Sequence, residues 1–410
     1  MKKFIYIIAS LLVIPTVLIA QSNIGVVNET GTDHKATIDQ NGILNTSYVT
    51  QTNDENTATI TQSNHNKNLN TYSDVNQSGV DNDATVIQNS KGLPVTEGTL
   101  KTVVNQSGDR NEALQVQGPH TFQGSAYGEI IQGGNDNFAS QHQVKFGNEA
   151  RIKQAGNNNT AQQGQDAELL DNEDGSFNNA TIDQSGNNNK AFQKQNGGTN
   201  IALINQAGGS NTATQNQKGM FDNAKAYQSG SSNTSFQDQR TGFNEAEVNQ
   251  SGSFNTAEQT QDVGNLLGGG NEASIDQSGN NNSSVQKQLG VMNEAKANQS
   301  GFGNSAIQEQ TGTMNTASID QASATSKAKQ IQKSGVDDEI LNKAEIRQWN
   351  GADNNAEQYQ TTCNVALNDA IILQNGSTNF AIQTQTGGDN FSSIAQNGVS
   401  HNAVVTQTMP

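Results

Sequence analysis

Polar and apolar residues recur along most of the chain with a period of eleven residues. The repeated unit reads Asn-x-Ala-x-x-x-Gln-x-Gly-x-x, and its closing glutamine occurs 31 times between Gln40 and Gln407. Of the 30 intervals between these glutamines, 22 are eleven residues long and eight are longer by one to eight residues. We therefore expect short regular elements, with the extra residues confined to the turns between them.

Within each unit the residues fall into two alternating sets, as the two faces of a β-strand require. Counted back from the closing glutamine, the sixth residue is Asn in 24 of 31 units, the fourth is Ala in 24, and the second is always Ile, Val, Ala or Gln. Among these positions only Asp222 carries a formal charge, whereas residues such as Lys153 and Glu245 occupy the intervening positions. The pattern predicts strands with one dry face and one solvated face.

A longer period of 22 residues distinguishes two kinds of arm. Two residues before the closing glutamine, Ile182 and Ile204 alternate with Gln193 and Gln215 in the units between them. Each arm is predicted to be a strand of about seven residues, followed by a corner in which glycine supplies the positive φ of a tight reversal. The clearest corner glycines are Gly186, Gly208, Gly230 and Gly252.

These features predict an all-β fold, a two-sided β-solenoid whose 22-residue coils (strand-turn-strand) stack into cross-β amyloid. The expected organisation is a signal peptide over 1–20, an N-terminal segment over 21–33, about 31 repeat arms over 34–407 and a C-terminal tail over 408–410. Pro94 and Pro119 fall in the longer intervals, so they interrupt no predicted strand.

Side-chain amides dominate the composition, with 57 Asn and 46 Gln among 410 residues. In coils stacked about 4.8 Å apart, a column of amides can pair each N–H with the C=O of the next coil. A buried amide left unpaired would destabilise the fold by roughly 1–3 kcal/mol, so amide ladders are the condition for such a core. The predicted ladder positions are Gln184, Gln195, Gln206, Gln217, Gln228, Gln239, Gln250, Gln261, Asn189, Asn200, Asn211, Asn233, Asn244 and Asn255.

Charge and cysteine content exclude several classes of protein. A net charge of −17 argues against nucleic acid as a partner. A single cysteine, Cys363, rules out an internal disulfide framework, and five scattered histidines form no metal-ligand pair. We expect no cofactor, metal or catalytic residue. The carboxylates of 166–174 lack calcium-site spacing and are interpreted as a solvated loop, and Cys363 as an incidental thiol, with a crosslink between subunits as its alternative.

The N-terminal residues have the features of a secretory signal peptide. Lys2 and Lys3 precede an apolar run that leads to a small-residue cleavage site at Ala20. No other segment is long and apolar enough to span a bilayer, so we expect a secreted chain without a transmembrane segment. The repeats start near His34 and close at Gln407 without an apparent cap, which predicts head-to-tail stacking into a homopolymer.

The repeat is similar to that of the curlin family, the major curli subunits, whose units read Ser-x5-Gln-x-Gly-x-Gly-Asn-x-Ala-x3-Gln. The best match runs Gln299-Ser300-Gly301-Phe302-Gly303-Asn304-Ser305-Ala306 and continues to Gln310, and the resemblance covers about nine-tenths of the chain. In this chain the second Gly of the motif is usually absent, and the array is several times longer than in the familiar curlins.

The resemblance implies an exported subunit that polymerises at the cell surface into the functional amyloid of a biofilm matrix. It also implies two partners. One is an outer-membrane secretion pore, which the unfolded subunit crosses from the periplasm, and the other is a nucleator subunit that templates the fibre.

The pattern and the resemblance together favour a non-enzymatic structural subunit of extracellular fibres with a role in adhesion. A monomeric β-solenoid surface adhesin is the main alternative, and it differs only in having blocked ends. Ice binding would need a flat outward array of Thr, whereas the outward positions are mixed. Cleavage of acidic polysaccharides would need Asp, Lys and Arg to converge at a break in the repeat, whereas the charges are dispersed.

Overall fold

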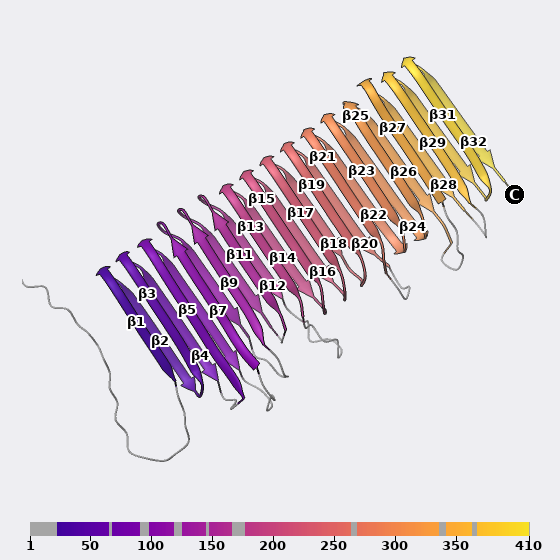
Figure 1. The fold of residues 1–410 in the computed structure, drawn as a ribbon. Coiled ribbons are helices and arrows are strands. Elements are labelled where there is room, and N and C mark those ends of the chain that lie inside the picture. Colours follow the sequence, from indigo (N-terminus) through magenta and orange to yellow (C-terminus); the bar gives the residue numbers. More distant parts are fainter. Residues whose placement is uncertain are drawn as a thin grey trace, which may run out of the picture.

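The computed structural model describes residues 23–64, 68–90, 98–118, 125–144, 147–165, 177–263, 269–335, 342–362 and 367–409. These residues form 32 β-strands and no helix. The odd-numbered strands make one parallel sheet of 16 strands, called sheet A here, and the even-numbered strands make a second, sheet B. Figure 1 shows a single continuous stack that runs from β1 and β2 at one end to β31 and β32 at the other.

Sheet A consists of β1 (Ile24–Thr32), β3 (Asn45–Asp54), β5 (Leu69–Val80), β7 (Gly98–Ser107), β9 (Ala126–Gly133), β11 (Glu149–Ala155), β13 (Asn179–Asn187), β15 (Ile201–Gly209), β17 (Asn223–Ser231), β19 (Glu245–Ser253), β21 (Glu272–Asn280), β23 (Glu294–Phe302), β25 (Thr316–Ala324), β27 (Asn342–Ala352), β29 (Asn368–Ser377) and β31 (Asn390–Val399).

Sheet B consists of β2 (Lys35–Gly42), β4 (Thr57–Asn64), β6 (Asp83–Ser90), β8 (Glu112–Gln117), β10 (Phe138–Gln143), β12 (Thr160–Gln165), β14 (Lys190–Asn196), β16 (Thr212–Lys218), β18 (Thr234–Gln239), β20 (Thr256–Asp262), β22 (Ser283–Val291), β24 (Ser305–Thr313), β26 (Lys327–Lys333), β28 (Asn355–Thr361), β30 (Phe380–Thr386) and β32 (Asn402–Thr408).

Each strand pairs in parallel with the strand one coil further along, and like residues face like. Gln206 of β15 lies beside Gln228 of β17, 22 residues later. The register survives insertions, since Gln165 of β12 still pairs with Gln195 of β14 across 30 residues. The predicted all-β, two-sided solenoid of 22-residue coils is therefore confirmed.

The space between the two sheets is filled by the positions that the alternation assigns to the dry face. In β15, for example, Ala202, Ile204 and Gln206 are at most 2% exposed. Sheet A contributes a column of Ile, Val and Ala, and sheet B places a glutamine column opposite it. Alanine keeps the sheets close together, and the aliphatic column supplies most of the apolar burial.

The glutamine column of sheet B does not extend to the ends of the stack. It begins at Gln115 and ends at Gln383. The first three coils carry Ile38, Ile60 and Val86 at this position, and the last carries Val405. The solenoid therefore has an amide-rich middle and aliphatic ends.

Most of the described corners turn through two residues of positive φ. The predicted glycine is the first, with φ of 95° at Gly186 and 106° at Gly208. The second lies two residues later and is usually not glycine: φ is 60° at Asn188 and 58° at Ser210. Sequence reasoning anticipated only the first, because the second position accepts Asn, Asp, Ser, Thr and even Phe.

Lengthened connections lie almost entirely on one edge of the solenoid. Seven of the eight longer intervals follow a glutamine that closes a sheet B strand, so they join sheet B back to sheet A. The eighth, longer by one residue, follows Gln348 of β27 in sheet A. The predicted leader, both insertion prolines, the acidic segment 166–174 and Cys363 lie outside the described residues.

The repeat array begins one arm earlier than the pattern predicted. β1 lies within the segment 21–33 and pairs in register with β3, which places Val27 beside Val49 and Glu29 beside Gln51. This arm lacks the closing glutamine of the repeat because Glu29 occupies that position. Gly25 similarly replaces the usual alanine.

The corner glycines allow a sharp test of the fold. A Cβ on Gly208 would lie 2.1 Å from the carbonyl oxygen of Gly230 at a φ of +106°, whereas a Cβ on Gly209 would meet nothing closer than 3.7 Å. We expect Gly208→Ala to destabilise the solenoid by about 1–3 kcal/mol through strain at positive φ, and Gly209→Ala to have little effect. The measurement is the midpoint of denaturant unfolding followed by circular dichroism. Equal midpoints for the two variants would contradict the corner assignment.

Candidate functional site: amide ladders and open ends

Three glutamine ladders run along the inside of the solenoid. The closing glutamines form one ladder in sheet A, from Gln51 to Gln396, and one in sheet B, from Gln40 to Gln407. The third is the inner column of sheet B that starts at Gln115. Side-chain N···O distances within the ladders run from 2.6 to 3.1 Å.

All eight predicted ladder glutamines lie in these columns. The sheet A ladder contains Gln184, Gln206, Gln228 and Gln250, and the sheet B ladder contains Gln195, Gln217, Gln239 and Gln261.

Each ladder has a direction, because the Nε2 of one coil always donates to the Oε1 of the coil that follows it in sequence. Gln206 Nε2 donates to Gln228 Oε1 at 2.8 Å, and Gln228 Nε2 donates to Gln250 Oε1 at 2.8 Å. The second Nε2 hydrogen crosses to a main-chain carbonyl of the opposite sheet, as from Gln206 to Lys190 O at 3.0 Å. Each buried amide thus bonds both along the stack and across it, which satisfies its donors.

The asparagine columns are bonded mainly through the backbone, and in part of the stack also by the side-chain bonds that the sequence predicted, as where Asn271 Nδ2 donates to Asn244 Oδ1 at 3.2 Å. Asn211 donates its own backbone N–H to the Asn189 side-chain oxygen at 3.0 Å, and its Nδ2 donates to Gly230 O at 3.1 Å. The shorter side chain keeps the amide beside the corner backbone, so it orders the corner. The same backbone N–H bond to the preceding coil is made by Asn189, Asn200, Asn233, Asn244 and Asn255.

Two buried glutamine oxygens lack a donor at the points where ladders begin. Gln115 Oε1 and Gln51 Oε1 have no hydrogen-bond partner among the described residues. The residue that precedes Gln115 in its column is Val86, which has no side-chain N–H. Glu29 precedes Gln51, and a carboxylate has no proton to donate. A ladder therefore needs a donor on its N-terminal side.

Asp222 is the charged residue that the sequence singled out in the dry positions, and the structure buries it to 1% exposure in an asparagine column. Its Oδ1 accepts the backbone N–H of Asn244 at 3.0 Å, but its Oδ2 has no partner. In Asn200, one coil earlier, the corresponding atom is Nδ2, which donates to Gly219 O at 3.0 Å. Burial raises the pKa of Asp222 to about 7, although the Asn244 bonds act to lower it.

The outer edges of the terminal strands are open. Among the described residues, no strand pairs with the outer side of β1, β2, β31 or β32. The aliphatic side chains next to these edges are only partly buried, including Ala36 and Ile38 at one end and Ala403 and Val405 at the other. Both ends therefore combine unpaired backbone groups with half-covered apolar side chains.

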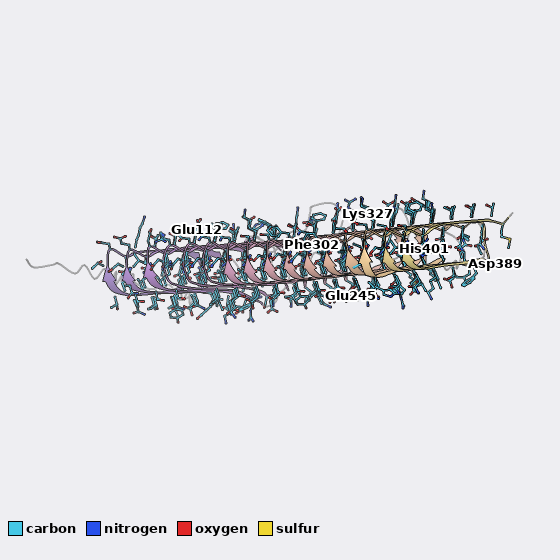
Figure 2. All side chains as sticks on the ribbon, turned by 90° about the horizontal axis from the view of Figure 1, so that it is seen from above. Glu112, Glu245, Phe302, Lys327, Asp389 and His401 are labelled. Atoms are coloured by element: carbon cyan, nitrogen blue, oxygen red, sulfur yellow. The ribbon has the colours of Figure 1, made fainter. Side chains whose placement is uncertain are left out.

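The outer faces of the two sheets carry the charges. Figure 2 shows Glu112 and Lys327 projecting from one sheet and Glu245 from the other. Several charges pair between neighbouring coils, as Arg151 with Glu129 at 2.7 Å and Lys225 with Glu245 at 3.3 Å. No group of three His, Cys, Asp or Glu in the described part of the chain is arranged to hold a metal ion.

One surface feature was missed by sequence reasoning. The second left-handed corner position, on the edge that joins sheet B to sheet A, holds Phe177, Phe221, Phe243 and Met292, each between 49% and 62% exposed. Phe221 and Phe243 stack with ring centroids 5.0 Å apart. Large apolar residues are rare at positive φ, so only knowledge of the corner geometry would have identified this row.

Asp222 makes the stability of the solenoid depend on pH. Because its folded-state pKa is raised from 3.8 to about 7, its contribution is fully favourable below about pH 4 and is lost as pH rises through 7. Ionisation then destabilises the fold by up to about 4 kcal/mol.

We expect Asp222→Asn to unfold at higher denaturant than the parent at pH 8 and to match it at pH 4. The control is Asp320→Asn, a change on the outer face of β25. If the denaturant midpoint of the parent shows no change with pH relative to the midpoints of the two variants between pH 4 and pH 8, then no buried carboxyl ionises in this range.

Comparison with known proteins supports one relationship. The family model of the curlin-associated repeat matches residues 31–63 and 290–322. No curated protein matches the chain. Separately, the described residues contain no helix long and apolar enough to cross a bilayer. The two matched segments have the same strand, corner and ladder geometry as the coils around them. The chain therefore contains curlin-associated repeats, within a stack of coils whose amide side chains are bonded along the stack.

Proposed function

We propose that the chain is the structural subunit of a curli-like extracellular fibre and that copies assemble head to tail. The observation that carries this proposal is the complementarity of the two open ends. The C-terminal end offers Nε2–H donors from Gln396 and Gln407, because every ladder donates toward higher residue numbers. The N-terminal end offers acceptors, since Gln40 Oε1 has no coil before it. The backbone N–H groups of the asparagine columns donate toward lower residue numbers and so present the reverse arrangement at each end. The two sets of groups match only when copies join in one orientation.

If a second copy continued the stack in register, eight pairs of dry-face positions would come into contact where the two copies meet. This contact between copies is called the joint here. Six of these pairs join residues of like chemistry, Ser392 meets Gly25, and Gln396 meets Glu29. The six are Asn390 with Asn23, Ile394 with Val27, His401 with His34, Ala403 with Ala36, Val405 with Ile38, and Gln407 with Gln40.

The aliphatic ends of the inner sheet B column fit the same geometry. Ile38 and Val405 each lie where the middle coils have glutamine, and each packs against an apolar cluster that stops at the end of the chain's own stack. Stacking a second copy would make the two clusters continuous and remove these side chains from water. An apolar side chain at the contact between copies, unlike a glutamine, does not need to align a hydrogen bond with its partner. This favours association of the copies.

The curlin-associated repeats support the remaining parts of the proposal: secretion through an outer-membrane pore, templating by a nucleator subunit, and a place in a biofilm matrix where the fibre serves adhesion. An exported subunit would stay unassembled inside the cell by crossing the membrane unfolded. The fibre would then grow where chains first fold, at the cell surface.

The assembly itself is directly testable. The chain from residue 21 onward, which contains every described strand, is released from denaturant and left to stand in buffer. We expect a lag, then fibres that bind thioflavin, and a lag that shortens when broken fibres are added as seeds. Oriented fibres should give a meridional reflection at about 4.8 Å, the spacing of the coils. A folded chain that stays monomeric at all concentrations would contradict the proposal and favour the monomeric adhesin.

The dependence of assembly on the ladder can be tested with three consecutive rungs. The triple change Gln206→Glu, Gln228→Glu and Gln250→Glu removes the donors of a buried column and stacks three carboxylates in it. We expect fibre yield to fall at least about tenfold at pH 7, by the loss of several buried hydrogen bonds.

The matched control adds three carboxylates to the outer face of the same strands through Asn205→Glu, Ser229→Glu and Ser251→Glu. It should keep the yield within about twofold of the parent, since exposed charges interact weakly. Equal losses in the two triples would show that added charge, not the broken ladder, limits assembly.

A further inference from the structure

Glu29 is the one carboxyl group that the fold places in a glutamine ladder. Its strand, β1, is the first of sheet A, and its register partner is Gln51. The sheet A ladder then continues through Gln51 and Gln77 with an N···O distance of 2.8 Å. Glu29 is exposed because its outer side faces the open end of the stack. If copies stack end to end as proposed above, Glu29 becomes an interior rung.

The protonation state of Glu29 determines whether this rung is complete. Ladder direction requires each rung to accept a hydrogen bond from the coil before it and to donate one to the coil after it. As a carboxylate, Glu29 can accept from Gln396 Nε2 of a second copy but cannot donate to Gln51. As a neutral carboxylic acid it has one O–H donor and a carbonyl acceptor, so it can do both.

An independent observation points to the same defect. Gln51 is 0% exposed, yet its Oε1 has no hydrogen-bond partner among the described residues. Its Nε2 is fully used, with bonds to Asn56 O at 2.9 Å and to Gln77 Oε1 at 2.8 Å. The missing donor is therefore the one that a protonated Glu29 would supply.

At the C-terminal end the donor for this joint is already positioned. Gln374 shows the complete pattern, with Nε2 bonded to Asn355 O at 3.0 Å and to Gln396 Oε1 at 2.8 Å. Gln396 Nε2 makes only the first kind of bond, to Phe380 O at 2.8 Å. Its second N–H is left for a rung beyond β31.

Two histidines also face this joint. His34 stands five residues after Glu29, the same spacing at which Gln51 Nε2 donates to Asn56 O across the corner of its own coil. Its Nδ1 accepts the backbone N–H of Asn56 at 3.4 Å. His401 takes the same column position at the C-terminal end, where Figure 2 labels it. In the joint its Nδ1 would meet the backbone N–H of His34, and protonation would oppose that bond.

The other side chains packed around Glu29 carry no charge toward it. The inward residues of β2 and β3 are aliphatic, hydroxyl or amide groups. The nearby charged groups of the same copy lie on outer faces or corners: Asp33, Lys35, Asp39, Asp54 and Glu55. A second copy would add Asp389, which precedes its strand β31 and so lies at the other end of that strand from Gln396. The ionisable side chains that point into the joint are therefore Glu29, His34 and His401.

We propose that Glu29 gates the end-to-end joint between copies of this chain: its carboxylate interrupts the amide ladder at the joint, and its neutral acid completes the ladder by donating to Gln51 and accepting from Gln396 of the adjoining copy. The joint is thus stronger when Glu29 binds a proton. At neutral and alkaline pH, the Glu29 carboxylate of a newly exported chain therefore opposes end-to-end stacking.

The test compares the parent with Glu29→Gln, which supplies the missing donor at every pH. The matched control, Glu294→Gln, removes the same charge from the outer face of β23. Seeds are added to the chain from residue 21 onward between pH 4 and pH 8, and the soluble concentration that remains at the plateau is measured. Both proteins carry His34 and His401, so the ratio of parent to variant isolates Glu29.

At pH 8 we expect the parent to leave at least about tenfold more soluble protein than Glu29→Gln, the effect of one buried unpaired group and a desolvated charge. The ratio should approach one by pH 4, and Glu294→Gln should follow the parent throughout. A ratio that does not change with pH, or a Glu29→Gln chain that assembles less well than the parent, would overturn the gate while leaving fibre assembly intact. Absence of fibres from all three proteins would instead overturn the proposed function, and the gate with it.

Discussion

A carboxamide buried between two sheets is stable only if a matching group lies one coil above it and another one coil below. Gln206 illustrates the requirement, since it is fully buried and bonded to Gln184, Gln228 and the backbone of the opposite strand. Identical residues must therefore recur at the same place in every coil. The repeat in the sequence is the direct result of this demand. So is the parallel register, which is kept across the longer connections and shifts only locally, where β27 has an extra residue after Gln348.

Because a glutamine donates in one direction along the stack, the fold acquires a polarity that an aliphatic core would lack. The three ladders all point the same way, and their ends are consequently unlike: donors at one, acceptors at the other. The aliphatic residues that replace glutamine at Ile38 and Val405 limit how many amides are left unpaired at the outermost coils. Burial and bonding requirements thus shape the ends of the stack differently from its middle.

Much of this architecture could be predicted from the sequence because it depends on residue type and spacing alone. Alternation with a period of two separates the dry positions from the wet ones, and the exchange of Ile204 for Gln215 distinguishes the arms. Features that depend on geometry were missed. β1 was overlooked because Glu29 takes a glutamine position. The backbone bonds of the asparagine columns, such as Asn211 N–H to Asn189 Oδ1, were not foreseen because they depend on where the corner places the main chain. The exposed phenylalanines at Phe221 and Phe243 could not be foreseen, since left-handed corners normally select small or polar residues.

The uneven placement of the longer connections has a consequence for sequence variation. Seven of them leave the stack where sheet B returns to sheet A, and the opposite margin has a single extra residue near Gln348. A long ribbon of such coils therefore has connections of nearly constant length along one margin and of variable length along the other. Residues can be added to the variable connections without a change in the pairing between coils, so that margin can diversify in sequence while the two sheets stay constant.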